Sequence, residues 1–243
     1  MWVSIFISSP SFSRTFDTKI QVLTFSQTFI FLQRYSLAKG AKMKIAYLSH
    51  ACFELSNAKT ILIDPFFEGN RNAVPYEKNP DIILVTHEHH DHSDAHKFDS
   101  LVVCPHNCGS KFRKTVTMRI GEIKMVEGIP IEMVEASHHQ SVYPAGYILE
   151  LERKRIYHMG DTYLDGVRNY GNIDILFIPI GGYYTMSMEE ALEALRIVKP
   201  RLAIPMHYST FPQIEADPFQ FKELAEDEGF TVRVFDFGET AKV

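Results

Sequence analysis

The feature that most restricts the fold is an apolar run that passes directly into a cluster of histidines. Residues 81–86 read Asp-Ile-Ile-Leu-Val-Thr, and residues 86–92 read Thr-His-Glu-His-His-Asp-His. A short, continuous apolar run of this kind is typical of a strand that is buried on both faces. We therefore expect a buried strand whose end delivers several imidazoles and a carboxylate to one place.

From Met43 onward the chain reads as two similar halves that are rich in short strands. Period-2 alternation and turn residues predict strands at Lys44–Ser49, Phe53–Ser56, Thr60–Asp64, Asp81–Thr86, Leu101–Cys104, Glu122–Val126, Ile129–Ala136, Gly146–Leu151, Arg155–His158, Asp174–Ile178, Arg201–Met206 and Thr231–Phe235. We also expect a helix directly after the histidine cluster. Strands followed by helices in each half predict an α+β fold, a four-layer αββα sandwich in one domain.

Two later helices are marked by the residues at their ends. Ser187 and Glu190 have the spacing of a capping box, and Pro200 stops the apolar stripe that follows them. Asp217 before a proline predicts the start of another helix, and Gly229 predicts its end about three turns later.

Composition bounds the class of protein and its partners. The chain has 243 residues and a formal net charge of −5, which gives no reason to expect an obligate nucleic-acid partner. No apolar run approaches the roughly 20 residues that span a bilayer, so we expect no membrane partner. Three cysteines in an otherwise cysteine-poor chain argue against a disulfide framework and favour a cytoplasmic location. Homo-oligomer formation remains open.

Residues 1–42 differ from the rest of the chain. They are rich in Phe, Ser and Thr, contain one acidic residue, and show no sustained period of 2 or 3.6 residues. We predict that residues 1–42 form an extension outside the fold or reflect a mis-assigned start, and that the domain comprises residues 43–243. An organellar transit peptide is a weaker alternative for the same composition.

The histidine cluster has the donors and the spacing of a metal site. His87, His89 and Asp91 alternate along the segment, so an extended loop can point all three to one side, whereas His92 turns elsewhere. Imidazole and carboxylate are ligands of zinc, iron and manganese. The alternative is a solvated histidine-rich turn. Glu88 is expected to face solvent or to support the ligands.

Further candidate ligands follow later predicted strands. His138, Asp161 and His207 each come directly after such a strand, and side chains from several strand ends can meet on one rim. His139 competes with His138 for the same role. His50 and His158 lie near the same strand ends, and for each a role supporting the ligands and a purely structural role remain open. Cys104 and Cys108 lack a fourth donor nearby, so packing is the better interpretation for both.

These motifs resemble those of the metallo-β-lactamase-like superfamily. The resemblance also includes Ile-Leu-Ile-Asp ending at Asp64, Tyr-His-Met-Gly-Asp-Thr around Asp161 and Ile-Pro-Met-His-Tyr around His207. More narrowly, residues 179–186 and 206–212 resemble a branch of metal-dependent hydrolases related to ascorbate-6-phosphate lactonase. The resemblance covers nearly all of residues 43–243.

The resemblance implies a hydrolase with two divalent metal ions, zinc first and manganese or iron as alternatives. One ion would be held by His87, His89 and His138, and the other by Asp91, His92 and His207, with Asp161 bridging both. Asp91 would also orient the attacking water, and Asp64 would support a histidine ligand.

The expected substrate is a small molecule, with a lactone or another ester as first choice. Phosphodiester hydrolysis by a nuclease of the same superfamily is the second choice, and thioester hydrolysis is the third. A non-hydrolytic metal-binding module is the alternative from another class. The complete set of expected ligands argues against such a module, and so does His89 at the position where the superfamily's diiron flavoproteins carry a glutamate.

Overall fold

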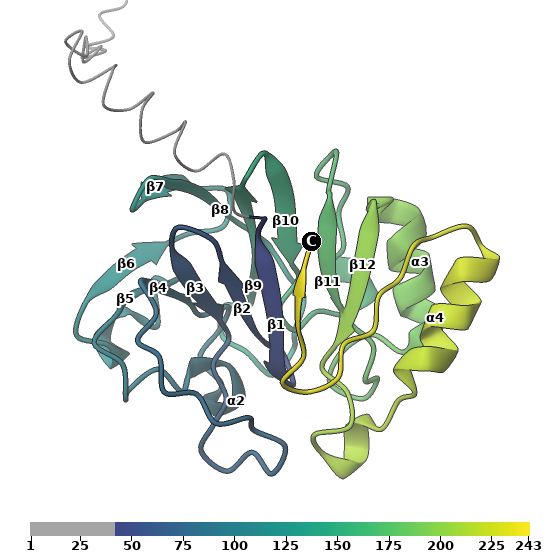
Figure 1. The fold of residues 1–243 in the computed structure, drawn as a ribbon, viewed down its shortest axis with the longest axis horizontal. Coiled ribbons are helices and arrows are strands. Elements are labelled where there is room, and N and C mark those ends of the chain that lie inside the picture. Colours follow the sequence, from purple (N-terminus) through teal and green to yellow (C-terminus); the bar gives the residue numbers. More distant parts are fainter. Residues whose placement is uncertain (1–41) are drawn as a thin grey trace, which may run out of the picture. The chain divides into compact units, whose positions relative to one another are not determined.

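Two mixed β-sheets organise residues 42–243, the part of the chain that the computed structural model describes (Figure 1). The predicted extension at residues 1–42 lies outside the described residues except for Lys42. The first sheet has the order β13-β1-β2-β3-β4-β5-β6, with strands Thr240–Lys242, Lys44–Ser49, Cys52–Ser56, Thr60–Ile63, Ile82–Leu84, Leu101–Pro105 and Thr115–Met118. The second has the order β12-β11-β10-β9-β8-β7, with strands Leu202–Met206, Ile175–Pro179, Lys154–His158, Ala145–Leu151, Ile129–Glu135 and Ile123–Val126.

Strand β1 shows how the pleat divides the apolar side chains of the first sheet. Ile45 and Tyr47 belong to the large core, whereas Ala46 and Leu48 point to the other face and join a smaller apolar cluster. Both faces of the sheet are therefore buried at this strand. This arrangement confirms the buried strand predicted for residues 81–86, of which Ile82–Leu84 form β4.

Large side chains join the two sheets across the core. The rings of Phe53 on β2 and Phe177 on β11 lie 4.2 Å apart between centroids. The hydroxyl of Tyr147 on β9 donates to the carbonyl of Val85 at 2.9 Å, so a buried polar atom also ties the second sheet to the strand that leads to the histidine cluster. Burying a side chain of this size contributes roughly 1.5–3 kcal/mol.

The outer layers of the two halves differ. Helices α3 (Met188–Val198) and α4 (Pro218–Asp227) lie beside β11 and β12 (Figure 1). The capping box of Ser187 and Glu190 is present, as predicted. The helix expected after the histidine cluster is only the four-residue α2, His90–Ser93. Aromatic side chains from loops cover the first sheet instead, so the sandwich is confirmed with one thin outer layer.

The C-terminal segment corrects one strand prediction. Thr231–Phe235 is not a strand; only Val232 forms an isolated bridge, with Ala203 of β12. The chain then leaves the second sheet and crosses to the first, where β13 pairs antiparallel with β1. A full strand at 231–235 is incompatible with that early departure. The sequence pattern also does not predict strands β6 and β13.

The candidate residues gather where strands of both sheets end, near α2 in Figure 1. His50, Asp64 and His207 follow β1, β3 and β12, and all three have positive φ values of 57°, 45° and 57°. Residues other than glycine adopt this left-handed conformation at a cost that the surroundings must offset, and such residues cluster at functional sites. None of the helices formed by residues 42–243 has the length and apolar character needed to cross a bilayer.

Candidate metal centre

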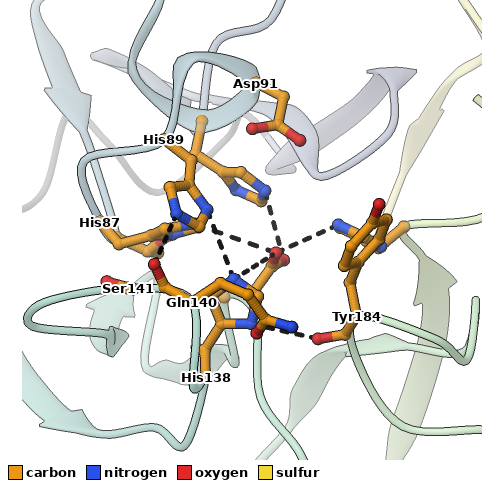
Figure 2. A network of polar contacts seen from close by, with 12 residues as sticks. His87, His89, Asp91, His138, Gln140, Ser141 and Tyr184 are labelled. Atoms are coloured by element: carbon orange, nitrogen blue, oxygen red, sulfur yellow. Dashed lines mark hydrogen bonds and ion pairs between the residues drawn. The ribbon is translucent and has the colours of Figure 1, made fainter. Parts of the chain in front are cut away.

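Three imidazoles form a first donor group, defined here as His87, His89 and His138. His87 Nε2 lies 3.0 Å from His89 Nδ1, and His138 Nε2 lies 3.3 Å from the same atom. Figure 2 shows the three rings pointing toward one another below Asp91. Two of the rings come from the loop after β4 and the third comes from the loop after β8.

The other ring nitrogen of each histidine has a hydrogen-bond partner of its own. His89 Nε2 donates to the carbonyl of Gln140 at 3.1 Å, and His138 Nδ1 donates to the carbonyl of Tyr184 at 3.1 Å. His87 Nδ1 lies 3.0 Å from Thr86 Oγ1, whose own proton goes to Asp64 at 2.7 Å. These partners assign the ring protons, so three lone pairs face one another at the centre of the group. Three converging lone pairs are the arrangement that a bound cation requires of its ligands.

The second donor group comprises His50, Asp91, His92 and His207. One donor atom from each lies within 4.8 Å of those of the other three. His92 Nδ1 donates to the buried carboxylate of Asp64 at 2.9 Å, which turns Nε2 toward the centre of the group. A carboxylate behind a histidine fixes its tautomer and raises its basicity as a ligand. Asp64 therefore has the supporting position that the resemblance implied.

Asp161 lies between the two donor groups. Its Oδ1 is 3.2 Å from His92 Nε2, and its Oδ2 is 3.2 Å from His207 Nε2 in the second group. The same Oδ2 is 3.9 Å from His87 Nε2 and 3.8 Å from His138 Nε2 in the first group. Gly160 permits the tight turn before this carboxylate, because its φ is +63° and a Cβ there would lie 2.6 Å from the carbonyl of Ala145.

Burial and charge act in opposite directions on the buried groups of the centre. Burial alone would lower the pKa of His92, but the carboxylates of Asp161 and Asp64 hold it well above its usual value. Burial alone would raise the pKa of Asp161, but His207 and His92 hold it well below its usual value. Burial, together with the neighbouring His92, keeps the pKa of His87 well below its usual value. Asp161 is thus an anion surrounded by imidazoles.

The donor set fits a divalent cation. His50 Nε2, His92 Nε2 and Asp161 Oδ1 are buried and have no hydrogen-bond partner among residues 42–243. Zinc–nitrogen distances of about 2.0–2.1 Å in a tetrahedral site place neighbouring donor atoms about 3.3 Å apart. The separations of 3.0–3.3 Å within the first group and of 3.2 Å from Asp161 to His92 and His207 match that spacing.

All of the predicted ligand residues are brought together, and His139 is separated from them. His138 is buried within the first group, whereas the exposed ring of His139 stacks on Tyr163 with centroids 5.0 Å apart. His158 has a structural role, because Nε2 donates to the carbonyl of Ala51 at 2.9 Å and Nδ1 accepts from the backbone of Gly160 at 3.2 Å. Cys104 and Cys108 are buried free thiols, in agreement with the packing interpretation.

Glu88 has a more specific role than a solvent-facing residue between two ligands. Its carboxylate accepts from the backbone nitrogen of Val142 at 2.6 Å and from the hydroxyl of Ser141 at 2.9 Å. The side chain therefore clamps the loop that carries His138 to the loop that carries His87 and His89. Glu88 and Ser141 are 53 residues apart in the chain, so the sequence carries no local signal for this clamp.

A cavity of about 390 Å³ opens above the donors. Its lining includes His89, Asp91, His138, Asp161 and His207 from the two groups, and the remaining lining residues are Gln140, Tyr184, Phe211 and Gln213. No lysine or arginine is among these lining residues in the part of the chain that the structure describes. The four wall residues were not predicted, because they become neighbours only when the loops after β8, β11 and β12 meet.

Comparison with known proteins agrees with this architecture. Residues 44–207 match the Beta-lactamase superfamily domain. The chain is 40% identical over 215 residues to a UPF0173 metal-dependent hydrolase of Pyrococcus abyssi, covering 78% of this chain and 95% of that protein. It is 37% identical over 219 residues to a similarly named protein of Archaeoglobus fulgidus, covering 79% of this chain and 94% of that protein.

Solved structures show the same similarity. Igni18, described as a novel metallo hydrolase from the archaeon Ignicoccus hospitalis, superposes with a TM-score of 0.74 at 28% identity, over 83% of this chain and 98% of that chain. The fold and the donor groups are those of a metal-dependent hydrolase with the metallo-β-lactamase fold. The chain belongs to the beta-lactamase superfamily and, within it, to the UPF0173 metal-dependent hydrolases.

Proposed function

We propose that the chain hydrolyses a small uncharged lactone or another ester at a centre that binds two divalent cations. The observation that carries this proposal is the convergence of two donor groups on one carboxylate, Asp161, at the floor of a cavity. When bound, the cations would supply Lewis acidity toward a carbonyl oxygen and would lower the pKa of a bound water to about 7.

The residues of the chain hold and orient the reactants. His87, His89 and His138 would hold the first cation, Asp91, His92 and His207 would hold the second, and Asp161 lies between the two groups within reach of both. Asp91 is also the proposed catalytic residue. Its side chain is 27% exposed and lines the cavity, so its carboxylate can orient the attacking water and accept its proton.

The walls of the cavity favour an uncharged ester over a phosphodiester. Gln140 and Gln213 offer neutral donors and acceptors, and Tyr184 and Phe211 offer aromatic surface. Proteins that select phosphate groups typically present arginine or lysine to them, and the described lining contains neither. The net charge of −5 also disfavours a polyanionic substrate.

The test pairs metal analysis with a matched panel of substrates. Purified protein is analysed for zinc, manganese and iron, and is then assayed on a neutral γ- or δ-lactone, a phosphorylated analogue of that lactone, a phosphodiester and a thioester. We expect two cations per chain and the highest kcat/KM on the neutral lactone or ester. A phosphodiester turned over faster than every ester would overturn the substrate class, and a chain that binds no divalent cation would overturn the mechanism.

A further inference from the structure

We propose that His50 is a ligand of the second cation through its Nε2 atom, in addition to Asp91, His92 and His207. The inference rests on the proposed two-cation centre and extends its ligand set. His50 follows β1, which lies in the first sheet next to β13 and β2. It therefore reaches the centre from a strand that supplies none of the seven ligands predicted from the sequence.

The Nε2 atom of His50 has the position of a ligand atom. The residue is fully buried, and Nε2 has no hydrogen-bond partner among residues 42–243. It lies 3.3 Å from Asp91 Oδ2, without the alignment of a hydrogen bond. That separation is within the range expected for two donors that share one cation with bonds of about 2.0–2.1 Å. A buried nitrogen placed in this way is costly unless a cation satisfies it.

The Nδ1 atom of His50 is held from the other side. It lies 2.5 Å from Thr210 Oγ1, 160 residues away in the chain. A hydroxyl that accepts from Nδ1–H places the ring proton on Nδ1 and leaves the Nε2 lone pair free. His92 is oriented in the same way by Asp64. Metal-binding histidines usually have such a partner on the second ring nitrogen, because it fixes the orientation of the ring.

The backbone of His50 is strained and is held in place from two sides. Its φ is +57°, that of Ser49 is +139°, and the β1–β2 register shifts at this point. The carbonyl of His50 accepts from the hydroxyl of Tyr47 at 2.8 Å and from the backbone nitrogen of His207 at 2.8 Å. His50 and the neighbouring ligand His207 are thus joined directly, and their rings lie 4.0 Å apart between centroids. Strain maintained in this way is a mark of a functional position.

A competing arrangement uses the same contacts. If the ring proton sits on Nε2 instead, His50 pairs electrostatically with the Asp91 carboxylate 3.3 Å away, accepts from Thr210 and only orients the carboxylate. In that case the second cation keeps all of its ligands when His50 is removed. The two arrangements therefore differ in how tightly the second cation is held, which can be measured without any substrate.

The experiment compares His50→Ala with the parent protein and with His139→Ala, a matched control at an exposed histidine outside both donor groups. Each full-length protein is loaded with zinc and dialysed against graded concentrations of a chelator, and bound zinc is measured by mass spectrometry. We expect His50→Ala to release the second zinc at a chelator concentration at least 100-fold lower than the parent protein requires. The first zinc should stay bound as in the parent. Thr210→Val should weaken the same cation about tenfold, as loss of a supporting contact does.

A second measurement uses the unmutated chain, so a poorly folding variant leaves the inference testable. Protein labelled with ¹⁵N-histidine and loaded with ¹¹³Cd should show a cadmium coupling on Nε2 of His50. Two bound cations without that coupling, or with unchanged affinity in His50→Ala, would overturn the role of His50 and leave the proposed function standing. A parent protein that binds fewer than two cations would instead count against the two-cation centre itself.

Discussion

The two donor groups face each other across Asp161 but are built differently. The first consists of three imidazoles whose other ring nitrogens meet a hydroxyl and two backbone carbonyls. The second contains the carboxylate of Asp91 and has the buried carboxylate of Asp64 behind His92. Negative charge and a carboxylate-supported histidine both raise affinity for a cation. The difference implies a tightly held second cation and a more exchangeable first one.

The largest effect should come from Asp161, whose carboxylate faces both donor groups. A carboxylate shared by two cations offsets their repulsion at roughly 3.5–4 Å. Asp161→Ala should therefore hold clearly fewer than two cations per chain, and kcat/KM should fall by orders of magnitude. If Asp161 were only a turn residue, its loss would cost about 1 kcal/mol of stability. Metal analysis beside a thermal melt separates the two, and full occupancy with only a lowered Tm would contradict the shared position.

Removing one ligand from the first group should lower the occupancy of the first cation and leave the second cation bound. His89→Ala should abolish measurable turnover and retain about one cation per chain, because the second group keeps all of its donors. His87→Ala should behave in the same way. The fold should persist in both variants, since the ligands lie on loops outside the core, and circular dichroism checks this. Parent-like rates in either variant would show that the first group is not a metal site.

The support behind His92 gives a sharper test of the difference between the groups. Asp64→Asn keeps the size of the side chain but removes its charge, so the second cation should bind about 10–100-fold more weakly. The first cation should be affected much less. Chelator titration measures both steps, and Asp99→Asn, at an exposed carboxylate that pairs with Lys114, is the control. Equal weakening of both cations would show that Asp64 supports the centre as a whole.

The first group depends on a different support, the clamp formed by Glu88. Glu88→Ala removes the acceptors for Val142 and Ser141, and the loss of a hydrogen bond to a charged group costs about 1.5–3 kcal/mol. Part of that cost should appear as looser positioning of His138. We expect about tenfold weaker binding of the first cation and unchanged binding of the second. Glu127→Ala, at an exposed carboxylate paired with Lys59, is the control.

The sequence predicts those parts of the centre whose residues lie close together in the chain or directly after a predicted strand. His87, His89, Asp91 and His92 lie within six residues after a buried strand, and their spacing alone indicates a shared site. His138, Asp161 and His207 each follow a strand, so the strand pattern places them at sheet ends. The αββα sandwich follows from the same pattern of short strands and helices, and it is also the fold that the resemblance implied.

The parts that could not be predicted depend on contacts between distant segments. The position of His50 depends on a left-handed turn and on Thr210. The cavity wall combines Gln140 with Gln213 from a loop after another strand. The short α2 and the departure of the chain after Val232 also reflect tertiary packing, because loop aromatics cover the first sheet and β13 must reach β1. The secondary-structure propensities of the individual segments do not report these tertiary contacts.

The smallest effect is expected from residues 1–42, which supply none of the residues of the two donor groups. Their sequence has no sustained apolar period, so we predict that they bury no face of the domain. A protein that starts at Met43 should keep its Tm within about 2 °C and retain both cation affinities and kcat/KM, since a change well below 1 kcal/mol moves the Tm of a domain of this size by no more than that. Mass measurement of the native chain shows which start is used. Loss of soluble expression, or weaker binding of either cation in the shortened protein, would show that these residues belong to the domain and that the donor groups have support outside residues 43–243.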